Sequence, residues 1–229
     1  MPEEKQFSLN HFATLRLLPS FWALPGAERR ERLGEVARSL GRSADVLHLY
    51  QSHPIDVGAD LLFWSAIQVG GTGVPKDFFV AWGKALQPLR PFVEIPHVLW
   101  GFTRPSLYSK AKSSQEIDPF TKERSPYLVM YPFTKTAEWY LFDQDTRQQM
   151  MNEHMRIGKQ YRTITQLLLY SFGLQDQEFV VVYETEDLQR FSQLVYDLRA
   201  TEARKYTKED TPLHTGVHRT LEEIAGFVA

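Results

Sequence analysis

The chain has 229 residues, enough for one large domain or two small ones around a sizeable hydrophobic core. Its formal net charge of −2, the lack of any run near the ~20 apolar residues of a membrane helix and the absence of an apolar signal segment predict a cytoplasmic protein without nucleic-acid or membrane partners. Cysteine is absent, which excludes disulfides, zinc thiolates, iron–sulfur clusters and thiol catalysis.

The first half of the chain predicts the order strand, helix, two strands, helix, strand. The helix from 27 to 40 is amphipathic, and Gly41 is expected to end it. Residues 53–58 form a plausible hairpin connection between the second and third strands. The expected strands are 11–18, 46–52, 60–69 and 98–103, and the expected helices are 27–40 and 77–89.

A polar, charged segment follows at residues 106–124 and has few apolar side chains. Such a composition is typical of a linker or a mobile flap. We therefore divide the chain into an N-terminal repeat at 1–105, a linker or flap at 106–126 and a C-terminal repeat at 127–229.

The second half repeats the order of the first. Trp22 and Trp139 are 117 residues apart, as are Arg30 and Arg147. A repeat unit of this size, read as β-α-β-β-α-β, is typical of a ferredoxin-like module. Two such sheets with helices on one face can pack as an α+β barrel within one chain, which is the fold class we predict. The expected elements are strands at 127–133, 164–172, 178–184 and 213–218, helices at 143–157 and 187–203, and a helix-like C-terminal tail.

One histidine interrupts an apolar stripe in the predicted helix at 143–157. Met150, His154, Ile157 and Tyr161 recur at helical spacing and so share one face. Such a histidine is commonly a core residue bonded to a backbone carbonyl. The alternative is an axial ligand to a haem iron in an apolar pocket.

The repeat offset serves as an internal control, because a duplicated fold needs equivalent packing in both halves. Burying a polar group costs desolvation free energy unless the group has a hydrogen-bonding or charged partner, so polar groups that occur in only one half need a reason. Four such exchanges within 36 residues indicate a site, although an interface ring, a solvated strand end and a satisfied core amide remain alternative interpretations of three of them. The exchanges are His154 for Ala37, Tyr131 for Thr14, Lys135 for Leu18 and Gln166 for Leu49.

These motifs resemble the chlorite dismutase-like superfamily, and within it they are most similar to coproheme decarboxylases. The resemblance covers the second half closely and the first half by pattern. It implies two ferredoxin-like repeats that form a barrel, assembled as a homopentamer. The motifs are Tyr-Pro-Phe-Thr-Lys at 131–135, Asn-Glu-His-x-x-Ile-Gly at 152–158, Tyr-Ser-Phe-Gly-Leu at 170–174 and Leu-Val-Tyr-Asp-Leu-Arg at 194–199.

Carried over residue by residue, the resemblance implies a haem site in the second half. His154 matches the proximal iron ligand, and Gln166 matches the distal position where chlorite dismutases have an arginine. Tyr131 matches the tyrosine that becomes a radical and attacks a propionate. Lys135 and Arg199 match residues that hold or pair with substrate carboxylates.

Two departures from the family pattern concern the groups that bind propionates. Phe133 replaces a methionine that is common in the decarboxylases, and Arg204 stands where a serine is usual. A further arginine of the family has no secure match within 117–124. Glu202 is a candidate to support His154 from behind.

The resemblance implies a hydrogen-peroxide-dependent conversion of iron-coproporphyrin III (coproheme) to haem b. The cofactors expected are iron-coproporphyrin III or haem b, with hydrogen peroxide as the oxidant. Gln166 is neutral and would stabilise an oxyanion poorly, which weighs against chlorite chemistry. The alternatives are a haem b peroxidase or chlorite-degrading relative and, from another class, a haem-binding or haem-trafficking protein without turnover.

Overall fold

The computed structural model describes residues 7–71, 74–108 and 113–229, and the chain divides into two compact units. The first unit consists of Met1–Thr103, Pro119–Lys122 and Thr215–Ala229, and the second of Arg104–Asp118 and Glu123–His214. The division expected from the sequence, 1–105, 106–126 and 127–229, stays a prediction.

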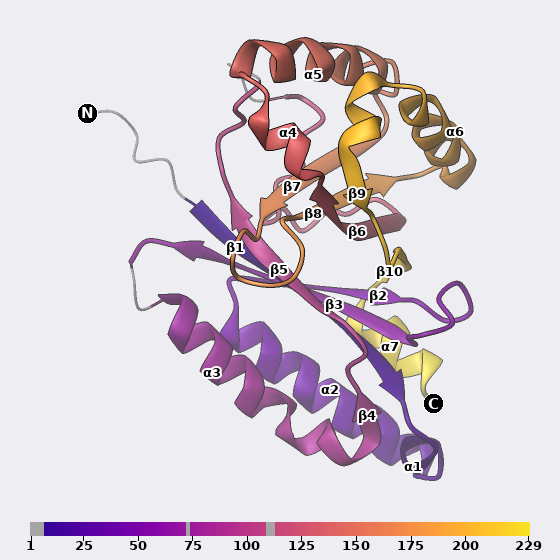
Figure 1. The fold of residues 1–229 in the computed structure, drawn as a ribbon. Helices are drawn as coiled ribbons and strands as arrows, with labels where there is room; N and C mark the ends of the chain where they lie inside the picture. The colour runs from indigo at the N-terminus through magenta and orange to yellow at the C-terminus, as the bar shows by residue number, and fades with distance from the viewer. Residues whose placement is uncertain (1–6, 72–73, 109–112) are drawn as a thin grey trace. The chain divides into compact units, whose positions relative to one another are not determined.

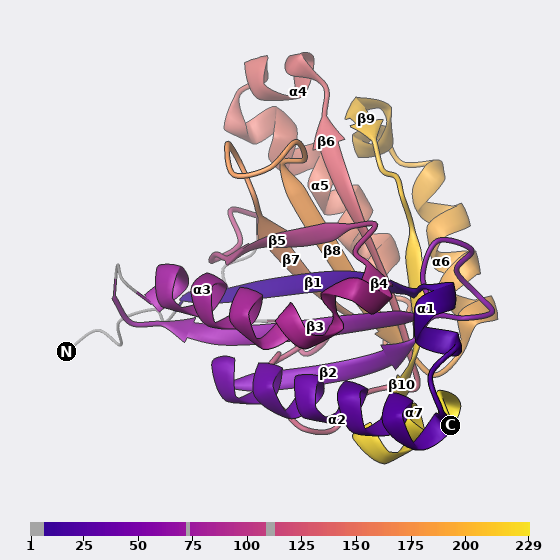
Figure 2. The same cartoon turned by 90° about the horizontal axis from the view of Figure 1, so that it is seen from below.

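The first unit is an antiparallel sheet in the order β10-β2-β3-β1-β5. Helices α2 and α3 cover one face of this sheet (Figures 1 and 2). Its elements are β1 (Phe7–Leu17), α1 (Pro19–Trp22), α2 (Gly26–Ser43), β2 (Val46–Gln51), β3 (Leu61–Val69), α3 (Val74–Leu86), the 3-10 helix η1 (Gln87–Phe92), β4 (Val93–Glu94), β5 (Val98–Thr103), β10 (His214–Arg219) and α7 (Leu221–Phe227).

The core of the first unit fills the layer between sheet and helices. Successive side chains of a strand point to opposite faces, so Leu9, Ala13 and Leu15 of β1 all reach this layer and are fully buried. The stripe predicted on α2 meets them there. Gly41 does not end α2, which continues to Ser43, where the Ser43 hydroxyl donates to the carbonyl of Leu40 at 2.7 Å.

The second unit is an antiparallel sheet in the order β7-β8-β6-β9, with α5 and α6 on one face (Figure 1). Asp143 caps α5 by accepting from the backbone N–H of Thr146 at 2.7 Å. The elements are β6 (Tyr127–Lys135), α4 (Ala137–Leu141), α5 (Gln144–Gly158), β7 (Thr165–Tyr170), β8 (Phe179–Thr185), α6 (Leu188–Arg199), the 3-10 helix η2 (Glu202–Tyr206) and β9 (Thr207–Glu209).

Two predicted boundaries in the second unit were wrong. The strand expected at 127–133 continues to Lys135, because β9 pairs with the end of β6 at Thr134 and Lys135. The helix expected over 187–203 ends at Arg199, and the chain tightens into the 3-10 turn η2 after a short break.

Strand pairing corrects the offset between the two repeats. In the first unit Ala13 lies opposite Phe63, and in the second Tyr131 lies opposite Val181, so both strands map with an offset of 118. The helices keep the predicted offset of 117 residues, because Ala37 and His154 take equivalent places in the apolar stripes of α2 and α5. The assignments of Tyr131 and Lys135 based on 117 were therefore one residue out of register and on the wrong face of the sheet. Gln166 was assigned two residues out of register, to Leu49, which lies on the same face as its equivalent Leu47.

With the corrected register, the exchanges between the repeats keep their character. Tyr131 replaces Ala13, and Lys135 replaces Leu17. Gln166 replaces Leu47, because Leu47 pairs with Ser65 and Gln166 pairs with Tyr183. Ser65 and Tyr183 are again 118 residues apart. The second repeat thus carries polar side chains where the first is small or apolar.

Among the described residues, none of the helices is both long and apolar enough to cross a lipid bilayer.

Candidate functional site

The sequence-predicted residues lie on the face of the second unit's sheet that carries α5 and α6. Cross-strand pairs put Val181 between Tyr131 on one side and Leu168 on the other, and put Gln166 beside Tyr183. Gln166 is exposed, and Leu168 is 37% exposed. The equivalent of Leu168 in the first repeat, Leu49, is only 6% exposed. The layer between helices and sheet is therefore partly open in the second unit.

His154 is on α5, on the face that carries Met150 and Ile157. Burial, together with the positive charge of Lys135, lowers the pKa of His154 to about 4, while Glu153 opposes the shift. The imidazole is therefore neutral near pH 7, the form that can bind a metal. Among the described residues, no backbone carbonyl accepts a hydrogen bond from this ring. That removes the contact expected of an ordinary core histidine.

Lys135 ends β6 and is half-buried, not a solvated strand end. Its ammonium donates to the carbonyl of Ala203 at 3.0 Å and lies 4.4 Å from the ring centre of Trp139. Burial lowers the pKa of Lys135 to about 8, against the opposing charge of Glu178. The group remains a cation at pH 7 and becomes neutral within a modest rise in pH.

Tyr131 lies between a second tyrosine and a charged cluster. Burial raises the pKa of Tyr131, and a hydrogen bond from the hydroxyl of Tyr183 opposes this. The charges of Asp210 and Arg199 also act on the phenol. Asp210 accepts ion pairs from Arg199 and from Arg204, each at 3.1 Å. The phenol is thus protonated at neutral pH and has guanidinium groups nearby.

The segment expected to be a flap holds Gln166 by its backbone. The N–H of Gln166 donates to the carbonyl of Gln115 at 2.7 Å, and its carbonyl accepts from the N–H of Ile117 at 3.0 Å. The side-chain amide of Gln115 donates to the carbonyls of Tyr161 and Ile164, each at 3.0 Å. Residues 113–118 are therefore tied to β7 and to the turn after α5, while 109–112 of the expected flap lie outside the described residues.

Two other charged residues considered from the sequence have structural partners. Arg124, from the stretch searched for a further arginine, is buried and lies 3.4 Å from Glu184. Glu184 faces away from α5 and α6, so this pair is not in the open layer. The carboxylate of Glu202 accepts from the ammonium of Lys205 at 2.8 Å. Among the described residues, no hydrogen bond or ion pair between the Glu202 and His154 side chains supports the role expected for Glu202.

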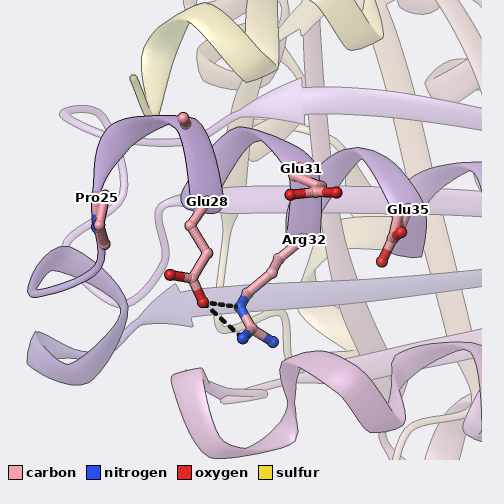
Figure 3. Close-up of a pocket in the computed structure, with 6 residues that line it drawn as sticks. Pro25, Glu28, Glu31, Arg32 and Glu35 are labelled. Carbon is pink, nitrogen blue, oxygen red and sulfur yellow. Dashed lines mark hydrogen bonds and ion pairs between the residues drawn. The ribbon is translucent and has the colours of Figure 1, made fainter.

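A separate hollow lies on the surface of the first unit along α2 (Figure 3). Glu28, Glu31 and Glu35 line it, and its one cation, Arg32, is bound to Glu28 at 2.6 Å and 2.8 Å. Its excess of carboxylates would repel an anionic ligand, and its exposed ion pair stabilises little. We do not assign a function to this hollow.

The chemistry of the open layer suits a flat, anionic ligand with one axial metal bond. His154 offers a neutral nitrogen, Leu168 offers apolar surface, and Lys135 and Arg199 offer cations. Within the described part of the chain, no cluster of three or more metal-ligating side chains occurs. Any metal here would therefore have to bring most of its own ligands, as a metalloporphyrin does.

Some neighbours of the site were not anticipated from the sequence. Tyr183 stands in an apolar strand, and its bond to Tyr131 depends on cross-strand register. Asp210 follows η2 and β9, and no motif marks it as the partner of Arg199 and Arg204. A search for polar residues in strands that face helices would have found Tyr183.

A model of the family described as chlorite dismutase matches residues 26–219. The coproheme decarboxylase of Mycolicibacterium smegmatis is 29% identical over 213 residues, which cover 87% of this chain and 86% of that protein.

Solved structures agree with this match. A crystal structure of a protein provisionally described as a chlorite dismutase is 28% identical, with a TM-score of 0.81 over 97% of this chain and 99% of that one. A chlorite dismutase variant from Candidatus Nitrospira defluvii is 24% identical, with a TM-score of 0.82 over 98% and 96% of the two chains. At that identity the second match supports the fold alone. The predicted α+β class with two ferredoxin-like repeats is confirmed.

Proposed function

Because this chain belongs to the chlorite dismutase family, we propose that it converts iron-coproporphyrin III to haem b with hydrogen peroxide as the oxidant. The observation that carries the proposal is the position of Tyr131, a protonated phenol on the helix-facing side of β6, with Lys135 at the end of the same strand and the charge of Arg199 acting on it from the end of α6. The coproheme decarboxylase among the curated relatives supports it.

The residues of the open layer fit an iron porphyrin. His154 would bind the iron through its neutral imidazole, and the apolar surface of Leu168 would contact the macrocycle. Lys135 and Arg199 would hold propionates by charge-assisted hydrogen bonds. The bound iron would supply the redox chemistry with peroxide.

The reaction removes a carboxylate that must first be oriented beside Tyr131. Each cycle takes one propionate, one hydrogen peroxide and one proton to one vinyl group, one carbon dioxide and two water molecules. We assign to Tyr131 the transfer of a hydrogen atom from its hydroxyl and back, because the hydroxyl is protonated and Tyr183 hydrogen-bonds it. Arg199 is held by Asp210 at 3.1 Å, so a substrate carboxylate would compete for an arginine that is already oriented.

Gln166 favours decarboxylation over chlorite breakdown. Its side chain is exposed on the open layer, and its backbone is fixed on both sides by residues 115 and 117. A neutral amide can donate hydrogen bonds but lacks the charge that would stabilise a developing oxyanion strongly.

The proposal is tested by supplying purified protein with coproheme and hydrogen peroxide and following the porphyrin by mass spectrometry. Successive loss of two carboxylates, with release of carbon dioxide, is the expected result. Peroxide-dependent oxidation of other substrates, or chlorite turnover, with intact carboxylates would instead identify a haem peroxidase or a chlorite-degrading enzyme. Tight haem binding without any turnover would identify a carrier.

Two further expectations rest on the resemblance alone. The homopentamer stays a prediction, and light scattering at micromolar concentration would test it. The cytoplasmic location also stays a prediction, and fractionation of the source cells would test it.

A further inference from the structure

Two phenol side chains stand next to each other on the helix-facing side of the second unit's sheet, Tyr131 on β6 and Tyr183 on β8. Tyr131 lies opposite Val181 in the strand pair, and Tyr183 lies opposite Val129, so the two tyrosines are diagonal neighbours. Their ring centres are 6.1 Å apart and their ring planes differ by 28°, which is a stacked arrangement. The pairing of β6 with β8 therefore holds the two phenols side by side.

The two phenols differ in their surroundings. Tyr183 is 6% exposed, and the ring of Phe191 on α6 lies 5.2 Å from its ring, centre to centre. Tyr131 is only half-buried. Tyr183 is thus enclosed between sheet and helix, whereas Tyr131 can meet a ligand in the open layer.

The hydrogen bond between the two phenols runs from Tyr183 to Tyr131. Among the described residues, the Tyr183 hydroxyl has no hydrogen-bond partner other than Tyr131. A buried hydroxyl that donates to nothing is costly, so its hydrogen goes to the Tyr131 oxygen. Burial raises the pKa of both phenols, and their hydrogen bond raises the pKa of Tyr183 further but opposes the rise for Tyr131. That asymmetry is expected when Tyr183 is the donor.

The first repeat has no such pair of phenols. The strand register places Ala13 at the position of Tyr131 and Ser65 at the position of Tyr183. The Ser65 hydroxyl is buried and has no hydrogen-bond partner among the described residues. The same module therefore folds without a phenol at either position, and the pair belongs to the repeat whose layer is open.

We propose that Tyr183 is a positioning residue for Tyr131: it donates its hydroxyl hydrogen to the Tyr131 oxygen and so directs the Tyr131 O–H toward the ligand. An oxygen that accepts from Tyr183 on one side points its own hydrogen away from Tyr183, into the open layer. The inference rests on the proposed function, because it takes this hydrogen as the one that is transferred.

The transfer leaves Tyr183 chemically unchanged. The O–H bond of Tyr131 breaks, and one hydrogen atom passes to the oxidant that hydrogen peroxide supplies. The bond re-forms when a propionate C–H bond breaks and its hydrogen atom moves to Tyr131. The propionate then loses carbon dioxide and one electron, which the same oxidant takes up, and a vinyl group remains. Tyr183 keeps its own O–H bond and stabilises the Tyr131 oxygen while that oxygen lacks a hydrogen.

The pKa of residue 131 tests the hydrogen bond without any porphyrin. With 3-fluorotyrosine placed at position 131 of the apoprotein, fluorine NMR follows the titration of this one phenol. Tyr183→Phe removes the donor and should raise the pKa by about one unit or more. Tyr161→Phe is the matched control, because Tyr161 belongs to the same apolar cluster but its hydroxyl is bonded to Asp197. This control should leave the pKa of residue 131 unchanged.

Steady-state kinetics with coproheme and hydrogen peroxide test the positioning role in the reaction. Tyr183→Phe should lower kcat for carbon dioxide release by about tenfold or more and leave KM for coproheme unchanged, because Tyr183 acts through Tyr131 and does not touch the substrate. Tyr161→Phe should match the wild type in both constants.

The outcomes separate this inference from the proposed function. If the wild type releases carbon dioxide but Tyr183→Phe leaves the pKa of residue 131 or kcat unchanged, the positioning role is wrong and the proposed function stands. If Tyr161→Phe changes the pKa and kcat as much as Tyr183→Phe does, the effect is structural and the positioning role is also wrong. If the wild type releases no carbon dioxide, the proposed function fails, and a role for Tyr183 in that reaction fails with it.

Discussion

The two repeats have the same order of elements and equivalent helix stripes but differ in the layer between helices and sheet. In the first repeat Ala37, Ala13 and Leu49 belong to a buried apolar core. In the second repeat the corresponding residues are His154, Tyr131 and Leu168, and Leu168 is 37% exposed. One copy of the module thus keeps a filled core, while the other carries ionisable groups beside an incompletely filled layer.

A buried histidine alone does not distinguish the two repeats. His11 on β1 of the first repeat also has its pKa lowered to about 4 by burial, against a hydrogen bond to the backbone. Its ring lies 4.6 Å from Trp82 and 5.7 Å from Phe78, centre to centre, so it is enclosed by aromatic rings. His154 differs in having a cation, Lys135, within electrostatic reach and an open apolar surface nearby.

The largest effect is expected from removing the neutral imidazole of the second repeat. His154→Ala should weaken coproheme and haem b binding by ~100-fold or more, or change the iron spectrum, because the axial bond is lost. His11→Leu is the matched control in the first repeat and should bind porphyrin like the wild type. Spectral titration of both variants measures this, and an unchanged spectrum in His154→Ala would rule out the axial role.

Acid should destabilise the protein through the same two histidines. Each has a folded pKa of about 4, below the ordinary histidine pKa of 6.5, so the unfolded chain binds more protons between these values. Stability is therefore retained above about pH 6.5 and lost as the pH falls toward 4, by roughly 2–3 kcal/mol for each group. Urea unfolding at pH 7 and 4.5 should show the loss, and His11→Leu and His154→Ala should each remove one share. A profile that neither variant changes would show that the histidines are not responsible.

A rise in pH should weaken porphyrin binding through Lys135. Its pKa is about 8, so the ammonium loses its proton between pH 7 and 9, and its attraction to a propionate is lost with it. We expect coproheme affinity to fall severalfold over this range in the wild type. In Lys135→Gln the affinity should be lower at pH 7 and nearly independent of pH, whereas an equal slope in both proteins would exclude Lys135 as the titrating group.

The smallest effect is expected from loosening the segment behind Gln166. Gln115→Ala removes hydrogen bonds to the carbonyls of Tyr161 and Ile164 and should lower the free energy of unfolding by about 1–2 kcal/mol. The matched control is Gln177→Ala, which should cost much less. Among the residues that the structure describes, the Gln177 amide donates only to the side chain of Gln175, at 2.7 Å. Urea unfolding of the two variants compares them, and equal costs would mean that residue 115 does not anchor the segment.

Much of the fold could be predicted from the sequence because both repeats carry strong periodic patterns. The strand at 98–103, for example, was predicted with its observed bounds. The register of the strands could not be predicted, since the offset of 117 was anchored on Trp22, Arg30 and their partners in helices. A single residue of difference in a connection leaves the helices aligned and moves strand side chains to the other face.

The candidate site could be predicted only for residues that a local pattern marks. His154 interrupts an apolar stripe, and Tyr131 and Lys135 belong to one short motif. The bond from Tyr183 to Tyr131 depends on the pairing of two strands that are distant in sequence. Spacing along the chain contains no information about such contacts.

The measurement that tests the proposed function most directly compares the wild type with Tyr131→Phe. The change keeps the ring and its packing and removes one hydroxyl, at a stability cost of about 1 kcal/mol for the bond with Tyr183. Coproheme binding should survive, because His154, Lys135 and Arg199 remain. Carbon dioxide release on addition of peroxide should fall by orders of magnitude, since phenylalanine has no hydroxyl hydrogen to transfer. Equal release from both proteins would contradict a role for Tyr131 and with it the decarboxylase proposed here.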